Sequence, residues 1–346
     1  MDRFLEWLKR VDIPTLIIFL FLIALFVLAA FIKVSIPSLL SDSIRRIGMN
    51  GVLVLAMVPT IRVGTGPNFG LPVGIIGGLL GALISMQLGL AGFTGFWVAI
   101  LFAILICLGI GLGYGWLLER VRGQEMMVGT YMGYSVVAFM SIMWLMLPFK
   151  NPDMIWAIGG KGLRYTLALD KYFAHILNNF LKFKIGGFEF PTGLLLFFAG
   201  ACFLVHLFFR TRTGLAIDLV GQNERYAISS GVNPNKARLI AVVLSNVLAG
   251  VGIIVYAQSY GFLQLYQAPL FMTFPAVASI LIGGASIKRA NIRNVIVGTA
   301  IFQTLLTIAL PVLSQVTRGD ITEVMRLIVS NGMILYALTR TPKEAR

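Results

Sequence analysis

Charge is scarce in this sequence. Lys, Arg, Asp and Glu together make up 12% of its 346 residues, whereas 58% are hydrophobic. A water-soluble domain carries about a quarter charged residues, so this composition excludes one. We therefore expect an integral membrane protein.

Cysteine is nearly absent too, and each of the two cysteines, Cys107 and Cys202, lies inside an apolar run. This excludes a disulfide framework and a cysteine-rich metal cluster. The only histidines, His175 and His206, fall in separate parts of the chain, and no acidic residue falls within an expected span. Proton-coupled carriers commonly place such groups within the membrane, so the sequence disfavours one.

A nucleotide-binding loop is also missing. A Walker A motif needs a glycine-rich turn ending in Gly-Lys and a hydroxyl residue, but the only Gly-Lys pair, Gly160-Lys161, is followed by Gly162. We therefore expect that this chain is not an ATPase, that it has no catalytic residue and that it binds no metal or cofactor.

Basic residues, in contrast, outnumber acidic ones by 28 to 14. They bracket apolar runs rather than lining one face, which argues against a nucleic-acid partner. Lys and Arg gather in the loops on the cytoplasmic side of a membrane protein. Their distribution predicts that both termini are cytoplasmic and that the number of spans is even.

A spanning helix needs about 20 apolar residues, or fewer if it is broken or buried. The sequence predicts a single transmembrane domain over 1–346, an all-α fold with about ten transmembrane helices. We expect these at 14–32, 47–60, 70–90, 93–118, 126–147, 191–209, 239–258, 270–285, 294–313 and 325–339. Trp7, Trp97, Trp116 and Trp144 fall near the ends of apolar runs, as interfacial anchors do.

The connection 210–238, expected on the cytoplasmic side, carries the signals of a short capped helix. Asn223 is suited to cap its start and Glu224 to its first turn, while Gly231 can take the left-handed conformation that ends a helix. Asn233-Pro234 is typical of the start of the next helix. We expect a helix of about two turns tied stiffly to two spans, which suits force transmission from a soluble partner or is simply a well-capped turn.

The run 213–256, TGLAIDLVGQNERYAISSGVNPNKARLIAVVLSNVLAGVGIIVY, resembles a signature of known permeases. These are the permease subunits of ABC importers for ribose, simple sugars, nucleosides and branched-chain amino acids. The turn LIGGASI at 281–287 is similar to their Gly-Gly-x-Ser turn, and the resemblance covers most of the chain from about residue 45 onward. The matching positions are Thr213-Gly214, Gly221, Asn223, Ala227, Ser230-Gly231-Val232, Lys236, Ser245 and Ala249-Gly250.

The resemblance implies a type II ABC importer permease fold in a bacterial cytoplasmic (inner) membrane. It implies partner ATPase subunits that carry ATP and Mg, a second permease, an extracytoplasmic solute-binding protein and membrane lipid. It also implies a coupling helix within 221–231 that contacts the ATPase. The expected coupling residues are Gly221, Asn223, Glu224, Arg225, Ala227, Ser230 and Gly231.

Among the departures from the family pattern, Asp218 stands where a basic residue is common. The solute implied is a simple sugar or nucleoside. A branched-chain amino acid or another small metabolite is the alternative, followed by a stand-alone secondary carrier. A lipid-modifying enzyme is disfavoured, because convergent His, Asp, Glu or Cys groups are missing from the interface.

The solute path is expected near 62–71, RVGTGPNFGL, where glycines and a proline interrupt the apolar pattern. Irregular backbone at membrane depth is tolerated where it lines a watery cavity or is shielded by protein. A plain loop in the inner headgroup layer fits this stretch equally well. Isolated polar residues in spans either contact the solute or hydrogen-bond helices together. The candidates for the path are Asn50, Thr65, Asn68, Phe69 and Gln258.

The segment 148–190 is expected to be extracytoplasmic. Within KYFAHILNNFLKF, the apolar Phe173, Ile176, Leu177, Phe180 and Leu181 recur at helical spacing, with Asn178, Asn179 and Lys182 largely on the other side. This pattern predicts an amphipathic helix at the membrane surface. A landing surface for a binding protein is compatible with it.

Overall fold

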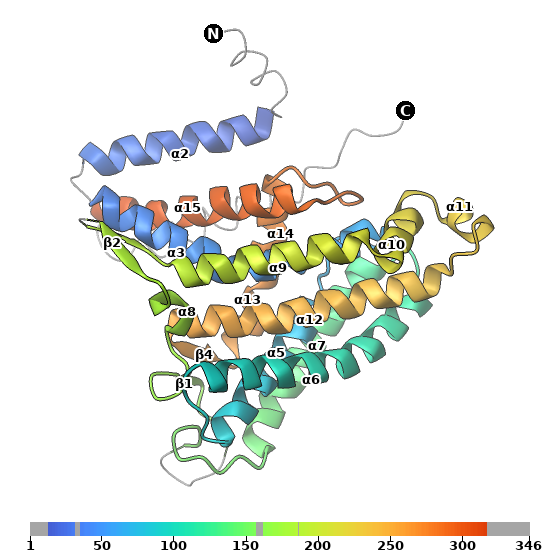
Figure 1. Cartoon of the computed structure of the whole chain (residues 1–346), viewed down its shortest axis with the longest axis horizontal. Helices are drawn as coiled ribbons and strands as arrows, with labels where there is room; N and C mark the ends of the chain where they lie inside the picture. Colours follow the sequence, from blue (N-terminus) through green and yellow to red (C-terminus); the bar gives the residue numbers. More distant parts are fainter. Residues whose placement is uncertain (1–12, 32–34, 157–161, 186, 317–346) are drawn as a thin grey trace.

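The computed structural model describes residues 13–31, 35–156, 162–185 and 187–316. The described chain is mostly helical, with long helices that run roughly along one axis (Figure 1). The longer helices are α2 (Ile13–Phe31), α3 (Ile36–Leu55), α5 (Leu71–Gln87), α6 (Gly92–Arg120), α7 (Glu125–Met146), α9 (Thr192–Arg210), α10 (Arg212–Gln222), α12 (Pro234–Tyr260), α14 (Thr273–Ile282) and α15 (Ile292–Val316). Four short helices connect them: α4 (Val58–Arg62), α8 (Ile176–Asn179), α11 (Glu224–Ser229) and α13 (Gln267–Phe271).

Two small antiparallel sheets correct the all-α expectation. β1 (Thr166–Ala168) pairs with β4 (Phe262–Gln264), and β2 (Phe183–Ile185) pairs with β3 (Phe188–Phe190). Both sheets lie at the end of the molecule opposite α10 and α11 (Figure 1). One end of the molecule therefore carries the two sheets, and the other carries α10 and α11.

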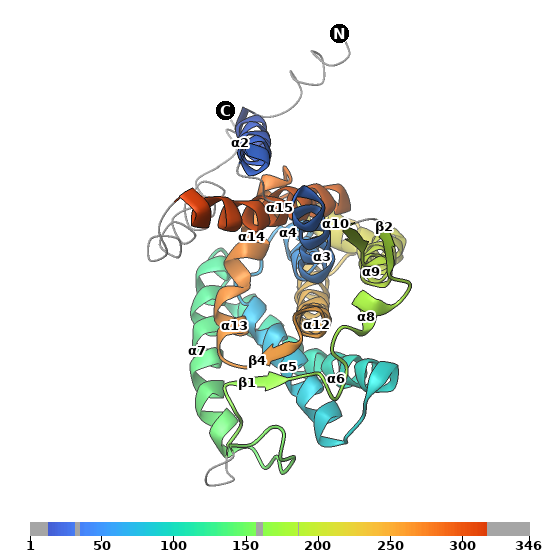
Figure 2. The same cartoon turned by 90° about the vertical axis from the view of Figure 1, so that its left-hand side faces the viewer.

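The core is built around α12, which lies among α3, α5 and α6 (Figure 2). Two-thirds of its most apolar stretch is buried, 67% against 22% for α7. Glycines bring α5 and α12 together: a Cβ on Gly78 would lie 2.3 Å from the carbonyl oxygen of Gly250. This approach confirms the role of small residues in helix packing that is typical of membrane proteins.

Five described helices are long and apolar enough to span a membrane, namely α6, α7, α9, α12 and α15 within 292–309. The segment 47–60, expected as one helix, is divided between α3 and α4. α3 begins at Ile36 and ends at Leu55, so Asp42, Arg45 and Arg46 lie within a helix rather than in a loop. The expected span at 270–285 is divided between α13 and α14. The span expected at 325–339 lies outside the described residues.

An exposed apolar stripe runs along one side of α6. It consists of Trp97, Leu101, Leu105, Leu108, Leu112 and Trp116. The two tryptophans are roughly 28 Å apart at the helical rise of 1.5 Å per residue, close to the thickness of the hydrocarbon core. Trp144, in contrast, is almost fully buried, so its expected role as an interfacial anchor is wrong, whereas Trp7 lies outside the described residues.

The segment 148–190 does not form the expected amphipathic helix. Only Ile176–Asn179 are helical, because His175 and Leu181 take left-handed backbone angles, φ 54° and 52°. Asn178, expected on the polar side, is buried and donates to the carbonyl oxygen of Ser259 at 3.4 Å. Tertiary hydrogen bonds to α12 override the local helical periodicity.

Candidate functional site

The end of the molecule opposite the sheets is formed by α4, α10, α11, the α6–α7 turn and the loop 283–291. α11 projects beyond the other helices there (Figure 1). This end contains the sequence positions that resemble a coupling helix.

The expected caps of α11 are present. The side chain of Asn223 accepts a hydrogen bond from the backbone N–H of Tyr226, and Glu224 occupies the first turn. Gly231 has φ +78°, the left-handed conformation that glycine adopts without steric cost. Asn233 caps α12, which begins at Pro234. One feature was not expected: α10 precedes α11 as a separate helix, and only Asn223 lies between them.

Glu224 fixes α11 to two other elements. One carboxylate oxygen accepts a hydrogen bond from Arg238 of α12 at 2.9 Å, and the other lies 3.6 Å from Arg122 in the α6–α7 turn. Arg122 also donates to Asn235 of α12. A displacement of α11 would therefore pull on α12 and on the α6–α7 turn together.

Arg62, at the end of α4, joins three further elements. Its guanidinium pairs with Asp218 of α10 at 3.1 Å and donates to the Ala290 carbonyl and the Asn291 side chain, each at 2.9 Å. It also lies 4.2 Å from the ring centroid of Phe209 in α9. Gly221 rests on the same residue, because a Cβ there would lie 1.8 Å from the carbonyl oxygen of Arg62. The junction leads directly into the irregular segment 63–70.

The outward side of α11 carries large exposed side chains. Tyr226 is 60% and Ile228 is 57% exposed, while Ala227 is buried against the rest of the chain. Arg225 and Ser230 are exposed as well. Exposed apolar side chains that project on a rigid helix are typical of a protein-binding surface.

The structure places Asn68, a candidate for the path, inside the protein. It is 4% exposed, its amide donates to the hydroxyl of Ser245 at 2.8 Å, and its carbonyl accepts from the Tyr114 hydroxyl at 3.2 Å. Ser245 in turn donates to the backbone of Ala56 at 2.6 Å. Asn68 thus ties the 63–70 segment to α6 and α12.

Three other candidates also make internal hydrogen bonds. Gln258 is fully buried and accepts from the backbone N–H of Leu177 at 3.2 Å. Asn50 donates to the carbonyl of Arg46 at 2.9 Å, and Thr65 donates to that of Thr60 at 2.9 Å. The structure does not bring these residues together in one cavity.

Phe69 is different, because it borders a shallow groove between α5, α7 and the α13–α14 break. The ring of Phe69 lies 5.9 Å from that of Phe274. The Thr273 hydroxyl is buried without a hydrogen-bond partner. The groove is lined by Phe69, Pro72, Thr130, Tyr134, Leu270, Thr273 and Phe274.

Several residues of these sites were missed in the sequence. Arg62 counted only as the first residue of the stretch 62–71, Arg122 and Arg238 only as loop charges, and Tyr226 and Ile228 only as parts of a capped turn. Their partners are distant in the sequence, so no local spacing could reveal the pairs. Within the described ranges no group of three or more His, Cys, Asp or Glu residues could hold a metal ion.

Comparison with known proteins gives a family and several relatives. Residues 39–338 match the family described as branched-chain amino acid transport system / permease component. The galactofuranose transporter permease protein YtfT of Escherichia coli K12 is 26% identical over 292 residues, 82% of this chain and 77% of its own length. The ribose import permease protein RbsC of the same strain is 26% identical over 289 residues, 81% of this chain and 80% of its own length. No solved structure matches the chain significantly.

Proposed function

The chain belongs to the permease-component family of branched-chain amino acid transport systems, and from this premise we propose that it forms the transmembrane path of a sugar importer. Its relatives named for ribose and galactofuranose transport support a simple sugar as the solute. A permease subunit performs no covalent chemistry. In this proposal ATP and Mg are bound by separate ATPase subunits, and a binding protein delivers the solute from outside.

The coupling segment, residues 212–231, is proposed to contact the ATPase. The single observation that carries this is the capped, projecting α11, whose exposed Tyr226 and Ile228 are free to enter a partner surface while Glu224 holds the helix to α12 and the α6–α7 turn. The proposed contact and the residues that support it also include Gly221, Asn223, Arg225, Ala227, Ser230 and Gly231. Movement of the ATPase would then reach segment 63–70 through Gly221 and Arg62.

The charges of the two ends support a cytoplasmic location for this segment. Basic residues dominate the end that contains α11, as the positive-inside rule requires of the cytoplasmic side. They are Arg62, Arg120, Arg122, Arg210, Arg212, Arg225, Lys236, Arg238, Lys288, Arg289 and Arg293. We propose about ten spans with both termini inside, in the inner membrane of a bacterium.

The path is proposed to follow the least buried span, α7, at the groove beside Phe69. Aromatic rings and hydroxyls, such as Tyr134, Thr130 and Thr273, are suited to a neutral polyol, because rings stack on its apolar faces and hydroxyls exchange hydrogen bonds. Thr65 lies in segment 63–70, which also contains Phe69. A second permease, another copy of this chain or a sister, would close the open side of the groove. Asn50, Asn68 and Gln258 are assigned to helix packing.

Reconstitution with a partner ATPase and a binding protein tests the proposal. We expect ATP-dependent uptake of labelled ribose or a related sugar into proteoliposomes. Uptake of leucine instead would assign a branched-chain amino acid, and uptake without ATPase subunits would indicate a secondary carrier.

The cap at Gly231 can be tested with a substitution. Valine at position 231 is strained at φ +78°, and about 1 to 2 kcal/mol of backbone strain would displace α11. We therefore expect Gly231→Val to retain ATP hydrolysis but to reduce uptake by about tenfold. Unchanged uptake in that variant would show that coupling does not depend on the cap at Gly231.

A further inference from the structure

The outer segment ends in an amphipathic β-hairpin formed by β2 and β3. Phe183 lies opposite Phe190, Lys184 opposite Glu189 and Ile185 opposite Phe188. Successive side chains of a strand point to opposite faces, and cross-strand partners share a face. Lys184 and Glu189 therefore lie on one face. The other face, named the apolar face below, consists of Phe183, Ile185, Phe188 and Phe190.

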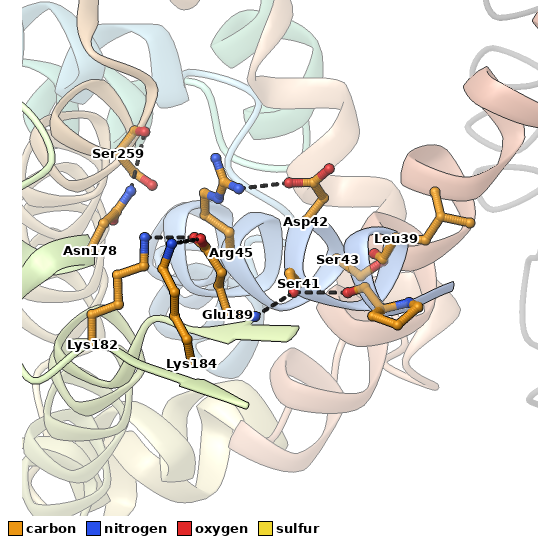
Figure 3. A network of polar contacts seen from close by, with 11 residues as sticks. Leu39, Ser41, Asp42, Ser43, Arg45, Asn178, Lys182, Lys184, Glu189 and Ser259 are labelled. Atoms are coloured by element: carbon orange, nitrogen blue, oxygen red, sulfur yellow. Dashed lines mark hydrogen bonds and ion pairs between the residues drawn. The ribbon is translucent and has the colours of Figure 1, made fainter. Parts of the chain in front are cut away.

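The polar face is bound to the rest of the chain. The backbone N–H of Glu189 donates to the hydroxyl of Ser41 in α3 at 2.8 Å. The Glu189 carboxylate pairs with Lys182 at 2.6 Å and also with Lys184 (Figure 3). The bond to Ser41 fixes the backbone of β3 to α3, and the lysine pairs lie on the polar face, so the apolar face is directed away from Lys182.

The apolar face is open on the β2 side, whereas Phe188 and Phe190 of β3 are half-buried. Ile185 is 68% and Phe183 is 45% exposed. The ring of Phe183 stacks on Phe190 with centroids 5.1 Å apart, and Phe188 lies 6.1 Å from Phe190. These aromatic rings contact one another across the hairpin. A contiguous exposed apolar patch of this kind marks a contact with a membrane or another protein.

The position of the hairpin in the chain indicates what the apolar face contacts. Phe190 is separated only by Pro191 from α9, a helix of span length and composition. A spanning helix begins where the chain leaves the headgroup region, so the hairpin lies at that depth. The neighbouring Phe180 packs edge-on against Phe93 at 5.6 Å, one turn before the exposed Trp97 on α6. Aromatic side chains concentrate at this level of a membrane.

We infer that the β2–β3 hairpin is a lipid-inserted wedge whose apolar face lies in the phospholipid leaflet on the side opposite the coupling segment. The proposal rests on the membrane orientation proposed above. Lys184 lies on the polar face, where its side chain pairs with Glu189 and is 61% exposed, so that its ammonium faces the headgroup side of the hairpin. The wedge holds the start of α9 and the start of α3 at a fixed depth through Glu189 and Ser41.

Site-directed spin labelling of the full chain in phospholipid nanodiscs tests this inference. A nitroxide on Ile185→Cys reports the apolar face, and one on Asp170→Cys, an exposed position of the same outer segment, is the matched control. Cys107 and Cys202 are buried, and the unsubstituted chain gives the background signal. We expect oxygen to relax the Ile185→Cys label at least threefold more effectively than a water-soluble nickel chelate does, with the reverse order at Asp170→Cys.

Two results would overturn the wedge. One is equal nickel accessibility of the two labels. The other is an Ile185→Cys label that leaves water only after the binding protein is added, which would assign the apolar face to protein docking. Uptake in vesicles separates this inference from the proposed function: a water-exposed label with intact ATP-driven uptake overturns the wedge alone, and a lipid-buried label without such uptake overturns only the proposed function.

Discussion

Arg62 and Asp218 form an ion pair, with Nη1 and Oδ2 3.1 Å apart, that joins α4 to α10. Asp218 is the position where the resembling permeases commonly carry a basic residue, and its partner is a cation of the same chain. Burial raises the pKa of Asp218, and the Arg62 guanidinium opposes this shift. The negative charge of Asp218, which departs from the family pattern, is thus compensated within the chain by Arg62, at the start of the proposed path segment.

The two partners should respond unequally to substitution. Asp218→Asn removes a charge that is costly to bury, so we expect its free energy of unfolding to change by less than about 1 kcal/mol. Arg62→Met leaves Asp218 unpaired and removes the donors to Ala290 and Asn291, with an expected loss of about 2 kcal/mol. Thermal unfolding in detergent measures both. Equal losses would contradict the assignment of Arg62 as the central residue of the junction.

The raised pKa of the Asp218 carboxyl predicts the direction in which stability changes with pH. The unfolded chain releases the Asp218 proton more readily than the folded chain, so this group favours the folded state fully below its unfolded pKa and loses that contribution as pH rises. Stability should therefore fall slightly less between pH 4 and 7 in Asp218→Asn than in the parent. A steeper fall in the variant would show that Arg62 dominates over burial.

Gly221 is predicted to be intolerant of any side chain. A Cβ there would lie 1.8 Å from the Arg62 carbonyl oxygen, so Gly221→Val must push α10 away from α4. We expect uptake to fall at least tenfold while ATP hydrolysis persists. Gly200→Val on α9 is the control, because nothing lies within 4 Å of a Cβ at Gly200. Comparable defects in both variants would indicate a general loss of folding.

Glu224 is predicted to transmit force rather than to bind the ATPase. Glu224→Gln weakens the pairs with Arg238 and Arg122, so we expect ATP hydrolysis in the complex with a severalfold lower uptake per ATP. Glu125→Gln removes the same charge from the same end of the molecule and should leave that ratio unchanged. Loss of ATPase binding by Glu224→Gln, seen in co-purification, would place Glu224 in the contact itself.

Asn68 is predicted to act on stability and not on solute selection. Asn68→Ala leaves the hydroxyls of Tyr114 and Ser245 without their buried partner, at a cost of about 1 to 3 kcal/mol. Asn50→Ala, which removes a half-exposed bond, should cost less than about 0.5 kcal/mol. Thermal unfolding measures the difference. An Asn68→Ala protein of normal stability with altered sugar preference would return Asn68 to the path.

The hairpin should withstand acid. Lys182 and Lys184 lower the pKa of Glu189 to about 2, so the ion pairs are fully present above the unfolded pKa of about 4.3 and are lost as pH falls toward 2. We expect a spin label on Ile185→Cys to keep its mobility from pH 7 to about pH 4 and to loosen below that. With Glu189→Gln the label should be loose at neutral pH. An acid transition that the substitution does not affect would have another origin.

The sequence by itself determined the membrane class, most helices and the caps of α11. These follow from local causes: an apolar run long enough to span, an asparagine that accepts a backbone N–H, and a glycine that tolerates a positive φ. Asn223, Gly231 and Asn233 are confirmed for this reason. The same local logic failed at 171–183, where helical spacing predicted an amphipathic helix and bonds to α12 impose two left-handed residues instead.

Only the tertiary structure decided which polar residues are structural and which charges meet. Asn68 and Asn50 look alike in the sequence, yet Asn68 is buried and bonded to α6 and α12, whereas Asn50 is half exposed. Arg62 meets Asp218 across more than 150 positions of the chain, and strand pairing places Phe183 and Phe190 on one face. Such pairs depend on how helices and strands dock, because a side chain gains a partner only where packing brings a distant element within reach.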